Sequence, residues 1–154
     1  MRTIKFRIWD TQEKKFYEPT HEAYNGKLDM LFVDLNGNLV RQTMTGLVHE
    51  SMFPDRYIKQ QLTGLKDKNE REIWEGDILS WSGWIGEVFW DNDFAAWRAK
   101  NIGSLGGIPN LEIIGNIWEN HDLLSEVRKT CIECGSTHVA SSDGQRCRSC
   151  ADGL

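Results

Sequence analysis

Apolar and polar residues alternate along much of this 154-residue chain, and this alternation constrains the fold more than any other feature. Every second residue of IKFRI, at 4–8, is apolar. A period of two is typical of a β-strand with one buried face. Further candidate strands lie at 28–34, from 39, and at 57–65, 77–81, 85–90, 94–99 and 111–118. Several short strands at this spacing predict a mainly β fold, either a small barrel or a sandwich.

Turn-forming residues separate these candidate strands. Asn36-Gly37 predicts a hairpin because both residues tolerate a positive φ. Gly115, inside the last candidate strand, predicts a bulge or a sharp bend. A single helix is expected after residue 120, with Asn120 as its cap and Asp122 near the positive end of the helix dipole.

All four cysteines lie in one C-terminal segment, as the two pairs Cys131/Cys134 and Cys147/Cys150. Two Cys-x-x-Cys turns brought together by a hairpin complete a tetrahedral shell of four thiolates. The segment has too few apolar residues to offset its ordering entropy without a metal. We therefore predict a structural zinc ribbon at 128–154, with iron as the alternative because thiolates also bind iron.

Two other uses of the cysteines fit the sequence less well. Disulfides are rare in cytosolic proteins. A redox Cys-x-x-Cys needs only one pair, placed at the start of a helix.

Charge is unevenly distributed along the chain. Residues 1–127 carry 14 Lys and Arg against 20 Asp and Glu, whereas 128–154 carry 4 against 3. An acidic body repels phosphate and permits attraction to a basic protein. The charge change and the onset of the cysteines predict a β domain at 1–127, which allows subdomains at 1–60 and 61–127, followed by the ribbon.

Five of the seven tryptophans fall between residues 74 and 97. Some of them are expected to fill a core. Trp81 and Trp84, on either side of Ser82-Gly83, are candidate anchors for a partner because tryptophan is enriched at binding hot spots. The acidic Asp91 and Asp93 are candidates for the same surface.

A second binding hypothesis involves the basic residues of the ribbon. Arg146 and Arg148, with Arg128 and Lys129, are candidates for a small nucleic-acid-binding face.

Four segments resemble one known family. They are IKFRIWD at 4–10, QLTGLKDKNEREIWEGDIL at 61–79, GEVFWDNDFAAW at 86–97 and LEIIGNIWENHDLL at 111–124. In these motifs the chain resembles the YopX family, small proteins found mainly in phages and prophages. The resemblance implies a mainly β protein whose later half, roughly 76–118, is a small SH3-like barrel, and it implies little about activity. Glu70 stands where a glycine is common, and His121 where a proline is common.

Catalytic motifs are missing from the sequence. It contains no Gly-rich phosphate loop, no Ser-centred elbow and no His-Glu-x-x-His motif. The expected function is therefore non-catalytic: a phage or prophage accessory protein that binds a host macromolecule, above all a nucleic-acid-handling host protein, in a counter-defence setting. A nucleic-acid-binding zinc-ribbon protein is the alternative.

No apolar stretch reaches the roughly 20 residues of a membrane span. The N-terminus lacks the apolar core of a secretory signal. We therefore expect a protein of the host cytoplasm that does not interact with membranes.

The zinc ribbon predicts a metal content. Elemental analysis of purified protein is expected to give one zinc per chain, with dispersed and protected amide signals from the final two dozen residues. The same amide signals in metal-free protein would refute the prediction, because the segment would then fold without an ion.

Overall fold

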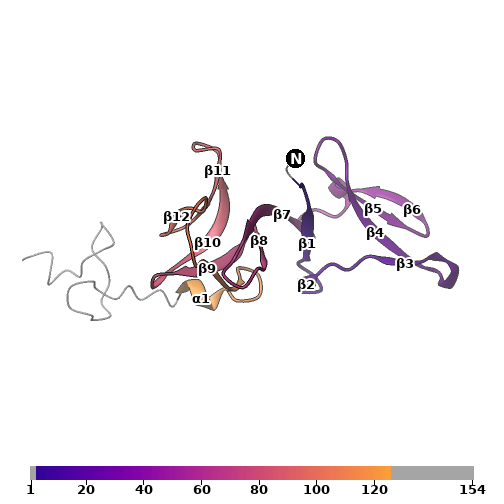
Figure 1. Ribbon diagram of the computed structural model, residues 1–154. Helices are drawn as coiled ribbons and strands as arrows, with labels where there is room; N and C mark the ends of the chain where they lie inside the picture. Colours follow the sequence, from indigo (N-terminus) through magenta and orange to yellow (C-terminus); the bar gives the residue numbers. More distant parts are fainter. Residues whose placement is uncertain (1–2, 126–154) are drawn as a thin grey trace, which may run out of the picture. The chain divides into compact units, whose positions relative to one another are not determined.

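The computed structural model describes residues 3–125 (Figure 1). The predicted zinc ribbon, with all four cysteines, lies outside the described residues. Strands dominate the described chain, and its one α-helix is the short α1 (Asp122–Ser125). The mainly β fold is therefore confirmed. The chain divides into two units, Ile4–Gln61 and the residues from Leu62 on, hereafter the first and second units.

A four-stranded antiparallel sheet in the order β3-β4-β5-β6 forms much of the first unit. Its strands are β3 (Thr20–Glu22), β4 (Lys27–Val33), β5 (Leu39–Thr43) and β6 (Gly46–His49). The predicted hairpin joins β4 to β5. An Asp34 carboxylate oxygen accepts the amides of Asn36 and Asn38, each at 2.8 Å, and Gly37 takes a φ of 87°. The side chain of Asp34 thus supplements the Asn-Gly signal.

A second sheet has the order β2-β1-β7-β8. Its strands are β1 (Phe6–Asp10), β2 (Lys15–Phe16), β7 (Tyr57–Lys66) and β8 (Glu72–Trp74). The 3₁₀ turns of the first unit are η1 (Ala23–Asn25) and η2 (Glu50–Met52). Ile8, Leu39 and Tyr57 form the small buried core of this unit.

The second unit contains a five-stranded sheet in the order β12-β11-β10-β9-β13, which curves into half of a barrel. Its strands are β9 (Asp77–Trp81), β10 (Trp84–Asp91), β11 (Ala96–Ala99), β12 (Gly103–Ser104) and β13 (Glu112–Asn116). The buried core consists of Ile73, Leu79, Val88, Trp97, Ala99, Leu105 and Leu111. This core is larger than that of the first unit, in keeping with the tryptophan-rich sequence of this half.

Gly76 and Asp77 shape the turn before β9. Gly76 has a φ of 77°, and the Asp77 carboxylate accepts the amide of Trp74 at 2.8 Å. The other Asp77 oxygen accepts the side-chain amide of Asn116 at 3.3 Å. Asp77 and Asn116 are both buried. These residues of the family motifs therefore have a structural role in joining β9 to the end of β13.

Gly115 marks a bulge, as predicted, because the pairing of β13 with β9 shifts between Ile113 and Gly115. A Cβ at Gly115 would lie 2.6 Å from the side-chain oxygen of Asn120. That oxygen accepts the amide of Asn116 at 3.2 Å. The side chain expected to cap the helix therefore ties the end of β13 to the following turn, and the helix begins with Asp122 in its first turn.

Asp67 links the β7–β8 hairpin to β13. One carboxylate oxygen accepts the amides of Asn69 and Arg71, at 2.8 and 3.0 Å. The other accepts the guanidinium of Arg71 at 2.6 and 2.9 Å and the amide of Ile113 at 3.2 Å. Burial alone would raise the pKa of Asp67, but these hydrogen bonds lower it to about 2. The carboxylate is thus a charged, fully bonded group in the interior.

Replacing Gly86 by alanine is expected to destabilise the second unit by about 3 kcal/mol or more. The new Cβ would lie 1.8 Å from the backbone carbonyl oxygen of Lys100, and one strand would have to move. Gly106→Ala is the matched control, because a Cβ there meets nothing within 4 Å. Urea unfolding followed by tryptophan fluorescence measures both variants. A stable Gly86→Ala protein would contradict the strand packing described here.

The lowered pKa of Asp67 predicts a loss of stability in acid. Its folded pKa of about 2 lies below the ordinary value of 3.8, so its contribution of about 2 kcal/mol is present above pH 4 and is lost as the pH falls toward 2. The difference in unfolding free energy between wild type and Asp67→Asn should therefore shrink between pH 5 and pH 2.5. Glu70→Gln, at an exposed carboxylate, is the control. A difference that does not change with pH would refute this role of Asp67.

Candidate functional site

The two tryptophans predicted as anchors pair across the β9–β10 turn. Trp81 and Trp84 are direct partners in the ladder, and Ser82 and Gly83 between them have φ values of 49° and 84°. The Trp81 indole packs against the core of the second unit and donates to the carbonyl of Pro109 at 3.0 Å. Both side chains are half-buried. Their role as anchors stays a prediction, and Trp81 has a structural role besides.

The other predicted pair, Asp91 and Asp93, lies at the β10–β11 turn (Figure 1). One Asp91 oxygen accepts the amides of Asp93 and Phe94, at 3.0 and 3.3 Å. The other oxygen accepts a guanidinium N–H of Arg98 at 2.9 Å. Asp91 therefore shapes the turn, while the side chain of Asp93 is exposed.

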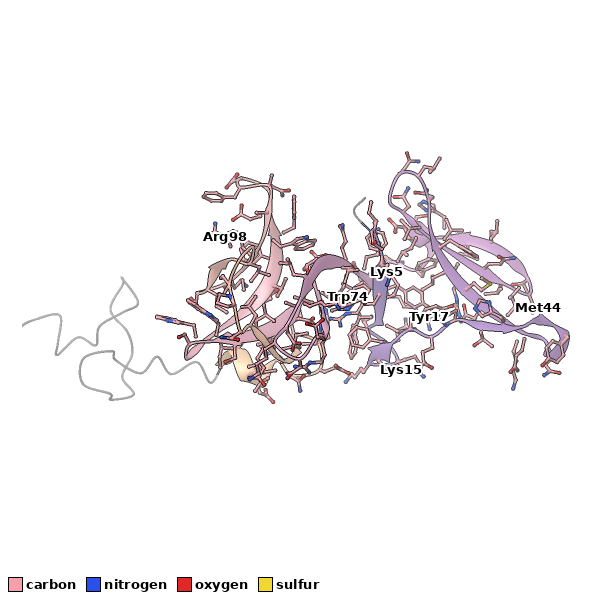
Figure 2. All side chains as sticks on the ribbon, in the orientation of Figure 1. Lys5, Lys15, Tyr17, Met44, Trp74 and Arg98 are labelled. Atoms are coloured by element: carbon pink, nitrogen blue, oxygen red, sulfur yellow. The ribbon has the colours of Figure 1, made fainter. Side chains whose placement is uncertain are left out.

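Phe94 presents an aromatic ring at this same turn. Its side chain is 69% exposed, and the guanidinium carbon of Arg98, labelled in Figure 2, lies 4.6 Å from the ring centroid. Trp90, near the end of β10, is 36% exposed and makes an edge-to-face contact with the buried Trp97. Trp90 pairs with Trp97, whereas Asp91 and Arg98 are each the next residue along their strands, so Trp90 lies on the other face of the hairpin from them. We call Asp91, Asp93, Phe94 and Arg98 the hairpin tip.

The negative charge of the chain belongs to the unit that carries the hairpin tip. Between Ile4 and Gln61, eight Lys and Arg are balanced by eight Asp and Glu. Between Leu62 and Ser125 there are five against eleven. The hairpin tip thus combines the exposed Phe94 ring with the exposed carboxylate of Asp93, within a unit that has an excess of acidic residues.

Two further carboxylates of the second unit have structural partners. Glu87 pairs with Lys100 at 2.7 Å, and Asp77 holds the turn before β9. Among residues 3–125, no three His, Cys, Asp or Glu side chains are grouped so that they could hold a metal ion. Arg146 and Arg148, like the cysteines, lie outside the described residues.

The first unit contains a polar pocket of about 680 Å³ that the sequence did not indicate. Two ion pairs line it. Arg41 binds Asp29 through two hydrogen bonds of 2.8 and 2.7 Å, and Arg56 lies 3.1 Å from Asp10. The Arg56 guanidinium also lies 4.9 Å from the centroid of the Tyr57 ring. Each of these two ion pairs is neutral, and the rest of the lining adds Lys15 against Glu13 and Glu18, so the pocket has no strong excess of either charge.

Tyr17, labelled in Figure 2, also lines this pocket. Its hydroxyl is buried and has no hydrogen-bond partner of good geometry among the described residues. Burial and the neighbouring Asp29 carboxylate raise the pKa of Tyr17. The hydrogen bonds from Arg41 lower the pKa of Asp29, so this carboxylate stays ionised.

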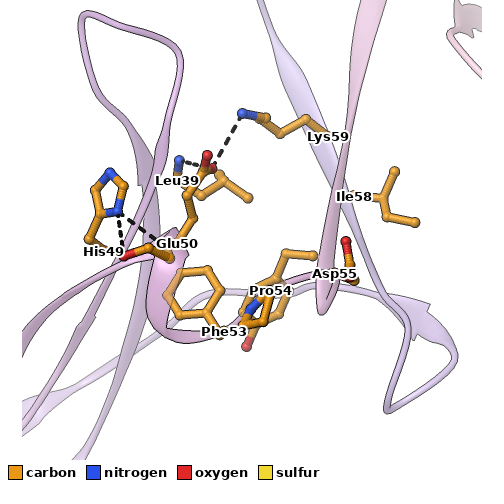
Figure 3. Close-up of a pocket in the computed structure, with 10 residues that line it drawn as sticks. Leu39, His49, Glu50, Phe53, Pro54, Asp55, Ile58 and Lys59 are labelled. Atoms are coloured by element: carbon orange, nitrogen blue, oxygen red, sulfur yellow. Dashed lines mark hydrogen bonds and ion pairs between the residues drawn. The ribbon is translucent and has the colours of Figure 1, made fainter.

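A second pocket of the first unit, with a volume of about 550 Å³, is shown in Figure 3. Glu50 accepts the amide of Leu39 at 2.6 Å and pairs with Lys59 at 3.5 Å. The amide hydrogen bond lowers the pKa of Glu50. His49 accepts the amide of Ser51 at 3.2 Å and so caps η2. These polar groups bind one another or nearby backbone amides, which is typical of a site with a structural role.

Sequence reasoning did not find Phe94 or Arg98. Phe94 was included only as part of an apolar strand pattern, although it lies next to Asp91-Asn92-Asp93. The turn chemistry of Asp91 was the signal that could have placed Phe94 in a loop, where an apolar side chain is exposed.

The fold and its surfaces define a small two-unit β protein whose hairpin tip carries an exposed aromatic ring and an exposed carboxylate. No helix in the described part of the chain has the length and apolar character needed to cross a membrane. The YopX protein family matches residues 5–125, and the chain belongs to this family.

Among solved structures, the chain is similar to the crystal structure of protein EF1440 from Enterococcus faecalis. The two share 26% sequence identity with a TM-score of 0.50, over 79% of this chain and 98% of that chain. No curated protein matches this chain.

Proposed function

We propose that this protein is a non-catalytic phage or prophage accessory protein that binds a basic host protein through the hairpin tip of its second unit. The partner that fits best is a nucleic-acid-handling protein of the host cytoplasm. Binding it would serve the phage in counter-defence against the host. The observation that carries the proposal is the exposed Phe94 ring, held in place within a unit that has five cationic against eleven acidic residues.

The geometry of the hairpin tip favours binding. Hot spots of protein interfaces are enriched in aromatic residues, and binding costs less entropy when such a side chain is already ordered. Arg98 stacks on Phe94 while it is paired with Asp91. Because Asp91 also accepts two amides of the turn, the ring is presented on a preformed loop.

The negative charge of the second unit would make this contact selective for a basic partner. Acidic groups around an apolar anchor raise the association rate with a basic surface and lower it with an acidic one. The exposed Asp93 is the acidic residue of the hairpin tip best placed for this effect. A phosphate backbone would be repelled by the same charges, which disfavours nucleic acid as the ligand of this unit.

We also propose the finer architecture. The half-barrel of the second unit, closed by the β7–β8 hairpin, is an SH3-like barrel. Supporting contacts run from the amide of Lys68 to the carbonyl of Leu111 at 2.7 Å and from Arg71 to the carbonyl of Ile113 at 2.7 Å. The spacing of Cys131, Cys134, Cys147 and Cys150 supports a zinc ribbon after this barrel.

Affinity capture from a lysate of the bacterial host tests the proposal. Tagged wild-type protein is expected to retain a host protein after nuclease treatment. Phe94→Ala should reduce that recovery at least tenfold, because hot-spot truncations cost about 2 kcal/mol or more. The turn should survive the change, since Asp91 binds the backbone of the loop.

Leu35→Ala is the matched control for the capture. Leu35 is fully exposed in the β4–β5 turn of the first unit, so its truncation removes an exposed apolar side chain from outside the hairpin tip. Equal recovery by Phe94→Ala and wild type would contradict the proposal. Recovery of nucleic acid alone, lost on nuclease treatment, would instead favour the nucleic-acid-binding alternative.

A further inference from the structure

The polar pocket of the first unit has the size of a small-molecule site. Its volume of about 680 Å³ falls within the roughly 300–1,000 Å³ of such sites. Small-molecule sites are mostly apolar, whereas two arginines and four carboxylates line this pocket. A polar lining favours a polar ligand, because an apolar one would cut these groups off from water without replacing its hydrogen bonds.

Three polar side chains come to the pocket from neighbouring strands of one sheet. Thr20 of β3 pairs directly with Asp29 of β4, so both side chains lie on the same face. Arg41 of β5 shares that face, because it is two residues from Thr43, the partner of Asp29 on β5. A hydroxyl, a carboxylate and a guanidinium thus lie side by side in the lining.

These groups keep hydrogen-bonding capacity that the protein itself does not use. Arg41 donates to Asp29 through Nε and Nη2, and Arg56 donates to Asp10 through the same two nitrogens. Among the described residues, neither Nη1 group nor the Thr20 hydroxyl has a hydrogen-bond partner. The side chains of Arg41, Arg56 and Asp29 are 25%, 22% and 32% exposed, so a ligand can reach them.

The aromatic rings of the lining are already in contact with other side chains. Tyr57 is buried and packs edge-to-face with Tyr17. The Arg7 guanidinium carbon lies 4.6 Å from the centroid of the Phe16 ring, and Trp9 contacts that ring edge-to-face. The pocket therefore lacks a free platform for stacking, which disfavours a ligand such as a nucleobase.

The unused donors and acceptors match one kind of ligand group. A hydroxyl both donates and accepts, so it can accept from Nη1 of Arg41 while it donates to the adjacent Asp29 carboxylate. The pocket lining has three cationic side chains against four carboxylates. A strongly charged ligand therefore gains little from this lining, whereas a ligand with several neighbouring hydroxyls can bond to both members of the ion pair.

We propose that the polar pocket binds an uncharged sugar or a related polyhydroxyl compound. One hydroxyl bridges Arg41 and Asp29, and others bond to the Thr20 hydroxyl and to Nη1 of Arg56. All these residues belong to the first unit, so this site does not depend on the partner binding proposed for the hairpin tip.

NMR titration of the ¹⁵N-labelled 154-residue chain tests the inference. Glucose, galactose, mannose and N-acetylglucosamine are added separately, with inorganic phosphate and uracil as comparison ligands. At least one sugar is expected to shift the amide signals of Thr20, Asp29, Arg41 and Tyr57 in a saturable way. A few net hydrogen bonds predict a dissociation constant of about 1 mM, so each titration extends to about 50 mM. Phosphate and uracil should give no saturable shifts at these amides.

Two variants remove single ligand contacts. Thr20→Val removes a hydroxyl and keeps the shape of the side chain, and Arg41→Lys keeps the positive charge beside Asp29 but removes Nη1. Each should weaken sugar binding about three- to tenfold, which is the usual effect of one hydrogen bond. Thr45→Val is the matched control, because Thr45 is exposed in the turn before β6 and does not line the pocket.

Far-UV circular dichroism and a thermal melt confirm that each variant is folded, and Thr45→Val should bind as wild type does. The inference would be overturned if none of the four sugars bound at these amides, or if phosphate or uracil bound there more tightly. Unchanged sugar binding by both folded variants, Thr20→Val and Arg41→Lys, would overturn it as well.

Discussion

The buried carboxylate of Asp67 is the interaction on which the second unit depends. The β7–β8 hairpin and the segment that enters β13 share one direct backbone hydrogen bond, from the amide of Lys68 to the carbonyl of Leu111. Asp67 adds the side-chain link, by binding amides of its own turn and the amide of Ile113, 46 residues away in sequence. Arg71 neutralises the charge and extends the link to the carbonyl of Ile113. A buried charge is tolerated here because every lone pair has a donor.

The two units of this protein are stabilised by different kinds of contact. The second unit buries seven hydrophobic side chains around Leu79 and Val88. The first has only three buried hydrophobic residues in its core and adds cross-strand ion pairs, such as Arg41 with Asp29, against aromatic rings.

Much of the strand content could be predicted because it depends on local pattern. The candidate strands at 57–65, 77–81 and 85–90 correspond to β7, β9 and β10. Short strands such as β2 and β12 were missed, since two residues carry no periodic signal. Glu70, noted as a departure from a common glycine, has a φ of 64°, which explains why glycine suits that turn. The candidate site was predicted less well: Asp91 and Asp93 were named as candidates for a partner-binding surface, but the neighbouring Phe94 was not.

By itself, the sequence determined the alternation of the strands and the positions of turns such as Asn36-Gly37, because side-chain period and backbone φ are properties of a few neighbouring residues. Of the two tryptophans predicted as partner anchors, only the tertiary structure decided which one has a structural role. Trp81 donates to a carbonyl 28 residues away. The tertiary structure also decided that the Asp67 carboxylate accepts the amide of Ile113. It likewise decided that the exposed Phe94 ring stacks against the Arg98 guanidinium. Contacts of this kind depend on how strands that are distant in sequence pack together. A local sequence pattern carries no information on that packing.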